Sequence, residues 1–485
     1  MAKNVTDYKM LIGGKWKDSS DGGVIEVRSP IDGQIIGHVP QGTRKDAVAA
    51  LTTSQAAFKA WALTPAVERA EYLLKLAAML RDEKEEFALS LTLEQGKTIR
   101  EARGEVDSAI MFIEYGAGHA RRLQGDINTS QNRDEQIWIQ KVPHGVTVGI
   151  IPWNYPLALS ARKFGNALVC GNTMIIKPPS LTPMTVLKFA QLVKKVGMPD
   201  GVLNIVTGRG SDMGDELVRN PISKLISITG STLAGSMLYK AAAEHIKILR
   251  LELGGKAPFI VMEDADIEKA VQAAIIARYS NCGQICVCNE RMYVHEAVYD
   301  QFLEKFISQV KTLKVGDPRD ESTDMGPKVS AEELEKLVKV MEKAKEQGAK
   351  VLCGGRKLVG GIFDRGYWFE PTVVEVYDNK MEIMQEETFG PIAPIMKVRS
   401  FDEALELAND SVYGLSAYLF TNTPRRIMRA VNELEFGEVY VNRTCGEQLN
   451  GFHTGYKHSG VGGEDGKYGL EAYLRNKTMY INYSE

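Results

Sequence analysis

The segment KVPHGVTVGIIPW, residues 141–153, is an apolar run rich in β-branched side chains that ends at a proline. Such a run is typical of a buried strand. The segment TMIIKPP (173–179) repeats the pattern and is also closed by prolines. A helix is predicted next, with Thr182 as its N-cap, Pro183 as its first helical residue and Gly197 as its stop.

Short apolar strands continue to alternate with amphipathic helices toward the C-terminus. Strands are predicted at 201–208, 224–230 and 247–255, and a helix begins at Ser231 between the last two. Strands joined through helices form crossover units. They indicate an α/β fold with a parallel sheet that helices cover on both faces.

A second α/β region is predicted after these strands, and Asp264 is expected to cap its first helix. Further along, the sequence favours a helix at 331–350 and strands at 370–376 and 415–420. Residues 475–485 look like a strand without a neighbour in sequence. We expect them to pair with residues 135–142 or with another subunit.

The composition excludes several classes of protein. The 485 residues include 59 basic and 62 acidic side chains, a formal net charge of −3, so neither net charge nor any basic run supports binding to nucleic acid. The chain shows no secretory signal and no apolar run of about 18 residues that would span a membrane. Six cysteines without a signal do not indicate a disulfide framework. We expect a cytoplasmic protein with free thiols and no membrane partner.

Half of the cysteines lie in one segment, NCGQICVCNERM (281–292). The C-x3-C-x-C spacing of Cys282, Cys286 and Cys288 is not a zinc-site spacing, so no metal is expected. A redox pair of Cys286 and Cys288 stays open as an alternative. Three cysteines are interpreted as small apolar side chains that pack in the interior: Cys170, Cys282 and Cys353.

Cys286 is the candidate nucleophile because of two other segments. A catalytic cysteine needs a base or a lowered pKa, and a donor for the oxyanion that it creates. LELGGK places Glu252 at the end of a predicted strand, and IPWNYP places the amide of Asn154 at the end of another. The ends of parallel strands face one crevice. The three side chains therefore supply nucleophile, base and oxyanion donor at one edge of the sheet.

Glycine-rich turns follow two of the predicted strands. ITGSTLAG contains Gly230 and Gly235, with Ser231 opening a helix, and GRGSDMG begins at Gly208. Free backbone N–H groups at the start of a helix suit a pyrophosphate. Either turn alone is weak evidence, but their recurrence after successive strands favours a dinucleotide-binding fold.

Taken together, these motifs resemble the aldehyde dehydrogenase superfamily over nearly the whole chain. The matching stretches run in order from YKMLIGGKWKDSS through PWNYP, IIKPPS, TGSTLAG, LELGGK, GQIC, EETFGP and FGEVYVN to SGVGGEDGKYGLEAY. The motif detail is similar to lactaldehyde, glycolaldehyde and glyceraldehyde dehydrogenases. The resemblance implies a Rossmann-like cofactor domain (1–120 and 143–253, with 446–472 returning to it), a catalytic α/β domain (254–445) and a small bridging β element (121–142 and 473–485). A homodimer or homotetramer is implied as well.

The resemblance also implies a mechanism. Cys286 attacks the aldehyde to give a thiohemiacetal, and Asn154 with the backbone N–H of Cys286 stabilises the oxyanion. Hydride transfer to a nicotinamide leaves a thioacyl-enzyme, which water activated by Glu252 hydrolyses to the acid. Relatives that pass the acyl group to coenzyme A usually lack the carboxylate at Glu252. The chain is therefore expected to be non-acylating.

For the cofactor, the resemblance implies contacts from Trp153 and Ser231 to the pyrophosphate, from Lys177 to the adenosine ribose, and from Glu387 and Phe389 to the nicotinamide ribose and ring. The remaining expected cofactor-binding residues are Gly208, Gly230, Gly235 and Leu253. One position departs from the family pattern: Ser180 stands where a glutamate often binds the ribose hydroxyls. A serine removes the repulsion of a 2′-phosphate. NADP is expected in preference to NAD.

The substrate prediction depends on Arg162, Glu447 and His453, a combination similar to the dehydrogenases that bind a 2-hydroxyl group. Because polar groups left unpaired penalise the wrong substrate, we expect a short 2-hydroxyaldehyde. Alternatives stay open: the three side chains merely pair with one another, Arg162 or Arg443 binds the carboxylate of a semialdehyde, or the chain is a cofactor-free thiol esterase or a non-catalytic family member. Cys288 and Cys445 are expected to line the substrate tunnel.

Overall fold

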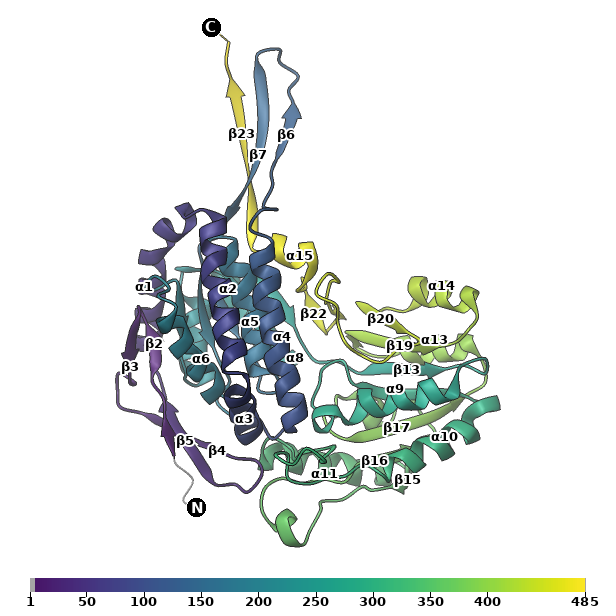
Figure 1. Ribbon diagram of the computed structural model, residues 1–485. Coiled ribbons are helices and arrows are strands. Elements are labelled where there is room, and N and C mark those ends of the chain that lie inside the picture. Colours follow the sequence, from purple (N-terminus) through teal and green to yellow (C-terminus); the bar gives the residue numbers. More distant parts are fainter. Residues whose placement is uncertain (1–4, 485) are drawn as a thin grey trace.

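The computed structural model describes residues 5–484, and Figure 1 shows two α/β units with a projecting sheet. Within these residues the larger sheet has eight strands in the order β22 (Gly460–Val461), β12 (Ile248–Glu252), β11 (Ser223–Thr229), β8 (Val146–Ile150), β9 (Thr173–Lys177), β10 (Leu203–Ile205), β2 (Met10–Ile12) and β3 (Lys15–Lys17). The five central strands are parallel, and β22, β2 and β3 add antiparallel edges. The predicted parallel sheet is confirmed.

Helices cover both faces of this sheet because its buried strands are apolar on both sides. Met174 and Ile176 of β9 pack toward one face and Ile175 toward the other, as strand alternation requires. The first face is covered by α2 (Ala66–Asp82), α3 (Lys84–Gln95), α4 (Ile99–Gly118), α5 (Pro156–Val169) and α6 (Met184–Lys195). The second is covered by α1 (Arg44–Leu63), α7 (Asp215–Arg219) and α8 (Thr232–Ala242).

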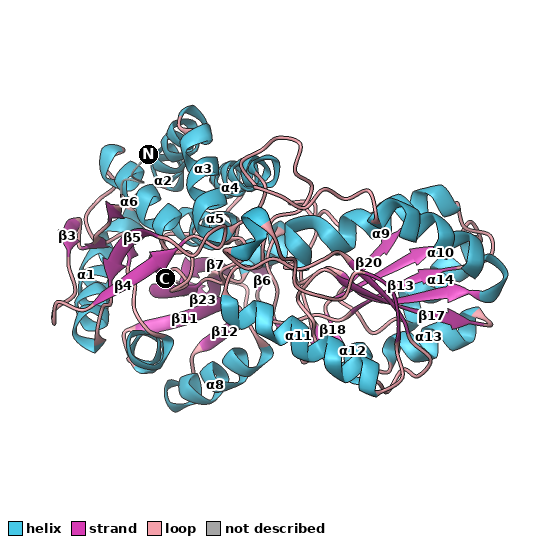
Figure 2. Cartoon of the chain, turned by 90° about the horizontal axis from the view of Figure 1, so that it is seen from below, coloured by secondary structure: helices cyan, strands magenta, loops and turns pink. Residues whose placement is uncertain are grey.

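The second unit has a seven-stranded sheet of its own (Figure 2). Its order is β15 (Lys350–Cys353), β16 (Thr372–Glu375), β17 (Ile392–Val398), β14 (Asn289–His295), β13 (Ala257–Val261), β19 (Ser416–Phe420) and β20 (Glu438–Val441). Residues of α9 (Ile267–Tyr279) and α10 (Glu296–Val310) form one core layer, and those of α11 (Ala331–Glu346), α12 (Glu382–Gln385), α13 (Phe401–Asn409) and α14 (Pro424–Glu433) the other. The predicted second α/β region is therefore present.

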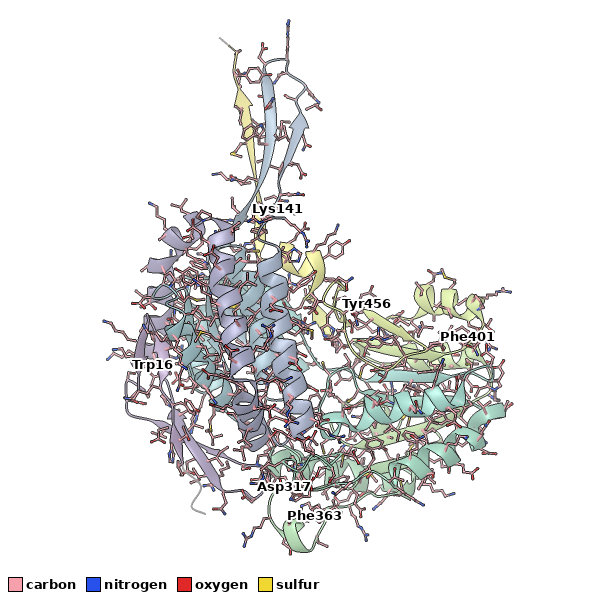
Figure 3. The ribbon with its side chains drawn as sticks, in the orientation of Figure 1. Trp16, Lys141, Asp317, Phe363, Phe401 and Tyr456 are labelled. Carbon is pink, nitrogen blue, oxygen red and sulfur yellow. The ribbon has the colours of Figure 1, made fainter. Side chains whose placement is uncertain are left out.

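A third sheet projects from the first unit (Figure 1). In it β23 (Leu474–Asn482) pairs antiparallel with β7 (Glu135–Pro143), which also pairs with β6 (Asp126–Thr129). The pairing predicted for the C-terminal strand with residues 135–142 is thus confirmed. At the base of this sheet Lys141 forms an ion pair with Glu471 of α15 (Gly466–Glu471) at 2.5 Å (Figure 3). Two small sheets complete the fold, β1 (Thr6–Asp7)–β5 (Ile35–Pro40)–β4 (Val24–Arg28) and β18 (Tyr413–Gly414)–β21 (Tyr456–Lys457).

Two predicted helix caps are wrong. Asp266, not Asp264, caps α9 by accepting a hydrogen bond from Lys269 N, while Asp264 accepts bonds from Thr421 and Thr423.

The other wrong cap is Thr182. The helix predicted after it, α6, begins at Met184 with Pro183 at the N-cap position. The buried Glu94 accepts hydrogen bonds from the first two N–H groups of α6, so the helix needs no Thr182 cap. Thr182 instead donates to the Trp153 carbonyl at 3.0 Å. No helix among residues 5–484 is long and apolar enough to cross a membrane.

The contact between α5 and α6 generates a stability prediction. Phe164 of α5 is 1% exposed and stacks on Phe189 of α6 with ring centroids 5.3 Å apart. Phe164→Ala removes a buried ring and leaves a cavity, which costs about 3–5 kcal/mol. We expect the midpoint of urea unfolding to fall accordingly. Leu63→Ala, at a position that is 77% exposed, should change it by less than about 0.5 kcal/mol. Equal effects of the two substitutions would contradict the packing described here.

Candidate active site

A cavity of about 1620 Å³ lies where the carboxyl ends of β8, β11 and β12 face turns of the second unit. Small-molecule pockets are typically about 300–1,000 Å³, so this volume has room for two ligands side by side. Twelve residues predicted for the site line it: Trp153, Asn154, Arg162, Gly230, Ser231, Glu252, Leu253, Cys286, Glu387, Phe389, Glu447 and His453. The other four, Lys177, Ser180, Gly208 and Gly235, lie outside the lining.

A tight turn presents Cys286 to the cavity. Asn281, Cys282 and Gly283 adopt φ angles of 48°, 57° and 69°, and left-handed backbone costs a non-glycine residue about 1–2 kcal/mol. The surroundings compensate for this strain. The buried Arg278 guanidinium donates to the Gly283 carbonyl at 2.9 Å and to the first backbone carbonyl of β14 at 3.0 Å.

Gly254 and Gly255, which follow Leu253 in the chain leaving β12, must be glycines because other atoms of the site approach their backbone closely. A Cβ on Gly255 would lie 2.3 Å from the Cys286 carbonyl oxygen, and one on Gly254 would lie 2.7 Å from a Glu387 carboxylate oxygen. Distances below 3.0 Å force neighbouring atoms to move. The two glycines therefore let the chain leaving β12 pass between the nucleophile turn and Glu387.

Asn154 lies in the loop between β8 and α5, and a buried ion pair fixes that loop. Its Nδ2 donates to the Gln284 carbonyl at 2.9 Å, and its own carbonyl accepts from Lys97 Nζ at 2.8 Å. Lys97 pairs with Glu105 of α4 at 2.6 Å, with both side chains fully buried. Glu105 also accepts two backbone N–H bonds from the start of α5. One Nδ2–H of Asn154 has a partner, and the amide carries a second.

Glu252 ends β12 and is 2% exposed. One carboxylate oxygen, Oε2, accepts from the Thr229 hydroxyl at 3.2 Å and lies 3.8 Å from Arg162 Nη1. The other, Oε1, is buried without a hydrogen-bond partner among the described residues. A buried acceptor of this kind is satisfied by a ligand or a water molecule.

Arg162 joins several carboxylates beside the nucleophile. It makes a two-pronged ion pair with Asp465, with Nε 2.9 Å from Oδ1 and Nη2 bonded to Oδ2. Its guanidinium also lies 3.6 Å from a Glu447 oxygen. Arg162 is 3% exposed, whereas the Glu447 side chain is 26% exposed and faces the cavity. The predicted set of Arg162, Glu447 and His453 is therefore brought together.

His453 is 2% exposed and is surrounded by acidic groups. Its Nδ1 lies 3.0 Å from Glu438 and 3.5 Å from Glu447, and its Nε2 lies 4.0 Å from Glu252. Burial alone would lower the pKa of His453. The three carboxylates outweigh burial and the nearby Arg162, and they raise that pKa well above its ordinary value. The carboxylates around His453 thus favour its protonated form, in which both ring nitrogens are donors.

The pKa of the Cys286 thiol is raised above its ordinary value, mainly by burial. Glu447 and Glu252 add to the increase, because a nearby negative charge disfavours a thiolate. His453 acts in the opposite direction, as a hydrogen-bonding cation next to the sulfur. The Cys286 thiol therefore experiences charges that also surround His453.

The other end of the cavity is aromatic and glycine-rich. Trp153 and Phe389 pack edge to face with centroids 5.3 Å apart. Glu387 accepts from the Gly255 N–H at 2.8 Å, and burial followed by the charge of Glu290 raises its pKa to about 8.

Ser231 closes that end of the cavity as the cap of α8, which confirms the predicted helix start. Gly235 acts through packing rather than as part of the lining. A Cβ there would lie 2.5 Å from Leu253, so the glycine allows α8 to approach the end of β12.

Lys177, at the end of β9, is 6% exposed. Among the described residues its ammonium donates one hydrogen bond, a long one of 3.4 Å to the Pro178 carbonyl. Burial lowers its pKa to about 8. Ser180 is exposed three residues later, and Gly208 forms a parallel β-bridge with Gly42. The buried Lys177 ammonium has no ion-pair partner among the described residues, and a bound anion would stabilise such a charge.

The remaining cysteines are free thiols. Cys445 lines the cavity as predicted, but Cys288 is 1% exposed and packs in the interior, so the prediction for Cys288 is wrong. Burial raises the pKa of both Cys282 and Cys288 to about 12.

Oxygen and nitrogen atoms of Glu438, Glu447 and His453 lie within 4.8 Å of one another, a spacing that a cation would also accept.

Four functional neighbours are absent from the sequence prediction: Lys97, Glu105, Glu438 and Asp465. Asp465 lies in GGEDGKYG, and its φ of 65° is rare for a side chain other than glycine. Acidic residues inside a glycine run were the one available signal for it. Glu438 lies in the quoted FGEVYVN stretch but carries no local signal of its own.

The fold and the site define a class of protein, an α/β oxidoreductase whose cysteine faces a dinucleotide-sized cavity between two units. The sequence profile of the aldehyde dehydrogenase family matches residues 16–479. This chain belongs to that family. It is 48% identical to a 3,6-anhydro-α-L-galactose dehydrogenase of Vibrio sp. (strain EJY3), covering 98% of this chain and 99% of the relative.

Other relatives and solved structures to which the chain is similar are also dehydrogenases by name. The chain is 41% identical to a D-glyceraldehyde dehydrogenase (NADP(+)) of Picrophilus torridus, over 98% of this chain and 96% of that protein. A structure of 3,6-anhydro-L-galactose dehydrogenase in complex with NADP superposes with a TM-score of 0.97 at 51% identity, covering 98% of this chain and all of the other. Lactaldehyde dehydrogenase from Escherichia coli superposes with a TM-score of 0.96 at 39% identity, covering 99% of this chain and all of the other.

The close approach at Gly255 generates a prediction. In Gly255→Ala the new methyl group displaces the Cys286 backbone, and a shift of about 1 Å at a reacting group can cost about 100-fold in rate. We expect kcat to fall by roughly that factor while the protein stays folded. Gly104→Ala, at an exposed helical position with open space around it, is the matched control and should leave kcat unchanged. A fully active Gly255→Ala enzyme would contradict the geometry.

Proposed function

We propose that this aldehyde dehydrogenase oxidises a 2-hydroxyaldehyde to the carboxylic acid, with NADP preferred over NAD and with Cys286 as the nucleophile. The observation that carries the proposal is the cluster of Arg162, Glu447 and His453 on the wall beside Cys286. Glu447 is a partly exposed acceptor and His453 a charged donor. A hydroxyl group donates one hydrogen bond and accepts two, so it can satisfy both.

In the proposed mechanism, the Cys286 sulfur attacks the aldehyde carbon, and the carbonyl oxygen gains the electron pair. The second Nδ2–H of Asn154 and the backbone N–H of Cys286 are the donors for that oxygen. The Lys97–Glu105 pair keeps the Asn154 loop in place, as a donor set for an oxyanion requires.

A bound nicotinamide, held beside Glu387 and Phe389, would supply the hydride acceptor that oxidises the thiohemiacetal to a thioester. Glu252 then removes a proton from the water that hydrolyses the thioester, and the Cys286 thiolate leaves. The unpartnered Oε1 of Glu252 is the acceptor available for this water.

The charge of the cluster argues against a semialdehyde. Two cations, Arg162 and His453, face four carboxylates, those of Glu252, Glu438, Glu447 and Asp465, which leaves the cluster with a net charge of about −2. Arg162 is already bound through two prongs to Asp465. The exposed Arg443 donates to the Thr444 and Gly446 carbonyls. A terminal carboxylate would therefore meet repulsion rather than a free guanidinium.

The named substrates of relatives support the same chemical class. Glyceraldehyde, lactaldehyde and the open-chain form of 3,6-anhydrogalactose each carry a hydroxyl group next to the aldehyde carbon. Succinate-semialdehyde dehydrogenases are also relatives, at 38% and 40% identity, and supply the second candidate.

The cofactor residues fit NADP. Three groups are available for the ribose that carries the 2′-phosphate. They are the Lys177 ammonium with its single long hydrogen bond, the exposed Ser180 and the backbone around Gly208. Ser231 at the start of α8 lies beside the cavity for the pyrophosphate. Glu387 and Phe389 are placed for the nicotinamide riboside. Relatives that are named or solved with NADP support the preference.

The predicted domain boundaries, a homodimer or homotetramer and a cytoplasmic location also remain proposals. The separation of strands into sheets supports the boundaries, since β8–β12 and β13–β20 fall in different units. The projecting sheet exposes apolar side chains such as Ile127 (69%) and Tyr480 (70%), which supports assembly. Free cysteines support a reducing compartment.

The first test is a matrix of initial rates for glyceraldehyde, lactaldehyde, propanal and succinic semialdehyde with NADP and NAD. We expect kcat/KM for the hydroxyaldehydes to exceed that for propanal at least about tenfold, since propanal leaves the polar cluster unpaired. The succinic semialdehyde value should be lower than the glyceraldehyde value. Cys286→Ser should remove all dehydrogenase activity. Preference for the semialdehyde would contradict the substrate proposal, and reduction of neither nucleotide would contradict the activity.

The second test addresses cofactor preference. Ser180→Glu places a carboxylate near the 2′-phosphate, and we expect kcat/KM for NADP to fall at least about tenfold while that for NAD is kept. Ser180→Ala, which removes the hydroxyl without adding charge, is the control and should lose much less.

The pH dependence gives an independent check of the same preference. Lys177 carries its charge below its pKa of about 8, so the KM for NADP should rise above pH 8 more steeply than the KM for NAD. Parallel profiles for the two nucleotides would exclude Lys177 from phosphate binding.

A further inference from the structure

Glu438, which opens the edge strand β20, faces the substrate cluster from behind His453. Its carboxylate lies 3.0 Å from His453 Nδ1, closer than the 3.5 Å of Glu447. The same Glu438 oxygen, Oε2, accepts the Tyr440 hydroxyl at 2.9 Å. The Glu438 side chain is 13% exposed and is not part of the cavity lining.

These contacts determine which way the imidazole points. With Nδ1–H directed at Glu438, the other ring nitrogen, Nε2, lies on the side of Glu252, 4.0 Å from its carboxylate. A histidine whose second nitrogen bonds a carboxylate keeps its orientation and its charge. Tyr440 keeps the carboxylate in position, since its ring is 7% exposed and packs on Tyr418 with centroids 5.1 Å apart.

We propose that Glu438 is the positioning residue that orients His453 so that its Nε2–H donates to the 2-hydroxyl group of the substrate. This inference rests on the proposed function. Glu438 acts only through His453. Glu447, which faces the cavity, accepts the hydrogen of the same hydroxyl. The arrangement thus assigns donor and acceptor to separate side chains.

A dependence on pH follows from the charges around His453. The carboxylates of Glu438, Glu447, Glu252 and Asp465 favour the imidazolium, whereas Arg162 and burial oppose it. The Cys286 thiol and the Tyr440 hydroxyl, which donates to Glu438, are further titratable neighbours. Replacing Glu438 with a neutral amide removes the nearest carboxylate, and His453 then loses its proton at a lower pH than in the native enzyme.

The test compares Glu438→Gln with the native enzyme in kcat/KM against pH, using glyceraldehyde and propanal with NADP. For glyceraldehyde we expect the alkaline decline to begin about one pH unit lower, with about a tenfold loss on that limb. Propanal has no hydroxyl group, so its profile depends on His453 only through the Cys286 thiol and should lose clearly less than the glyceraldehyde profile does. Glu438→Asp keeps the charge and should restore most of the native profile.

The matched control is Glu435→Gln, because Glu435 lies three residues earlier and pairs with Lys457 at the surface, at 2.6 Å. It should leave both profiles unchanged. An unshifted glyceraldehyde profile in Glu438→Gln, or an equal loss with both aldehydes, would overturn the proposal. If Glu438→Gln does not fold, Glu438→Ser is measured under the same criteria. Failure of the native enzyme to oxidise either aldehyde would instead overturn the proposed function.

Discussion

The ion pair between Arg162 and Asp465 is the interaction on which the arrangement of the site depends. Arg162 comes from α5, which packs on the larger sheet, and Asp465 comes from the segment just before α15, 303 residues later in the chain. Both are almost fully buried, so each would be costly to bury alone. Their pairing fixes the returning segment 446–465, which carries Glu447 and His453, against the helix that faces Glu252.

The same guanidinium allows several acidic groups to lie together beside Cys286. Burial raises the pKa of Asp465 to about 6, although Arg162 opposes that increase, so the carboxylate is still mostly ionised at neutral pH. Its left-handed backbone is a further cost that the pair must offset. Without Arg162, the carboxylates of Glu252, Glu447 and Asp465 would repel one another in a region of low polarisability.

The sequence predicts most of what is local and little of what is long-range. Strand alternation, the Gly-Gly pair after Glu252 and the start of α8 at Ser231 are all encoded within a few residues. Glu252 and Asn154 come together because parallel strands end at one edge, whereas Cys286 reaches them from a turn before β14 of the second unit. Thr182 and Asp264 are wrong as caps because distant side chains, Glu94 and the Thr421–Thr423 turn, take part in the bonding.

Lys97, Glu438 and Asp465 could not have been found from the sequence alone, because each acts through a contact with a distant segment. In the proposed mechanism, the charges around His453 act on both the substrate hydroxyl and the Cys286 thiol. Glu447, the proposed acceptor of a substrate hydroxyl, and Glu252 both raise the pKa of Cys286, whereas His453 lowers it. Additional acidic groups would add acceptors for a substrate hydroxyl, but they would also raise the pKa of Cys286 and so disfavour its thiolate. A protonated His453, which Glu438 favours, would offset this effect, because it lowers the pKa of Cys286 while the acceptors for the hydroxyl stay in place.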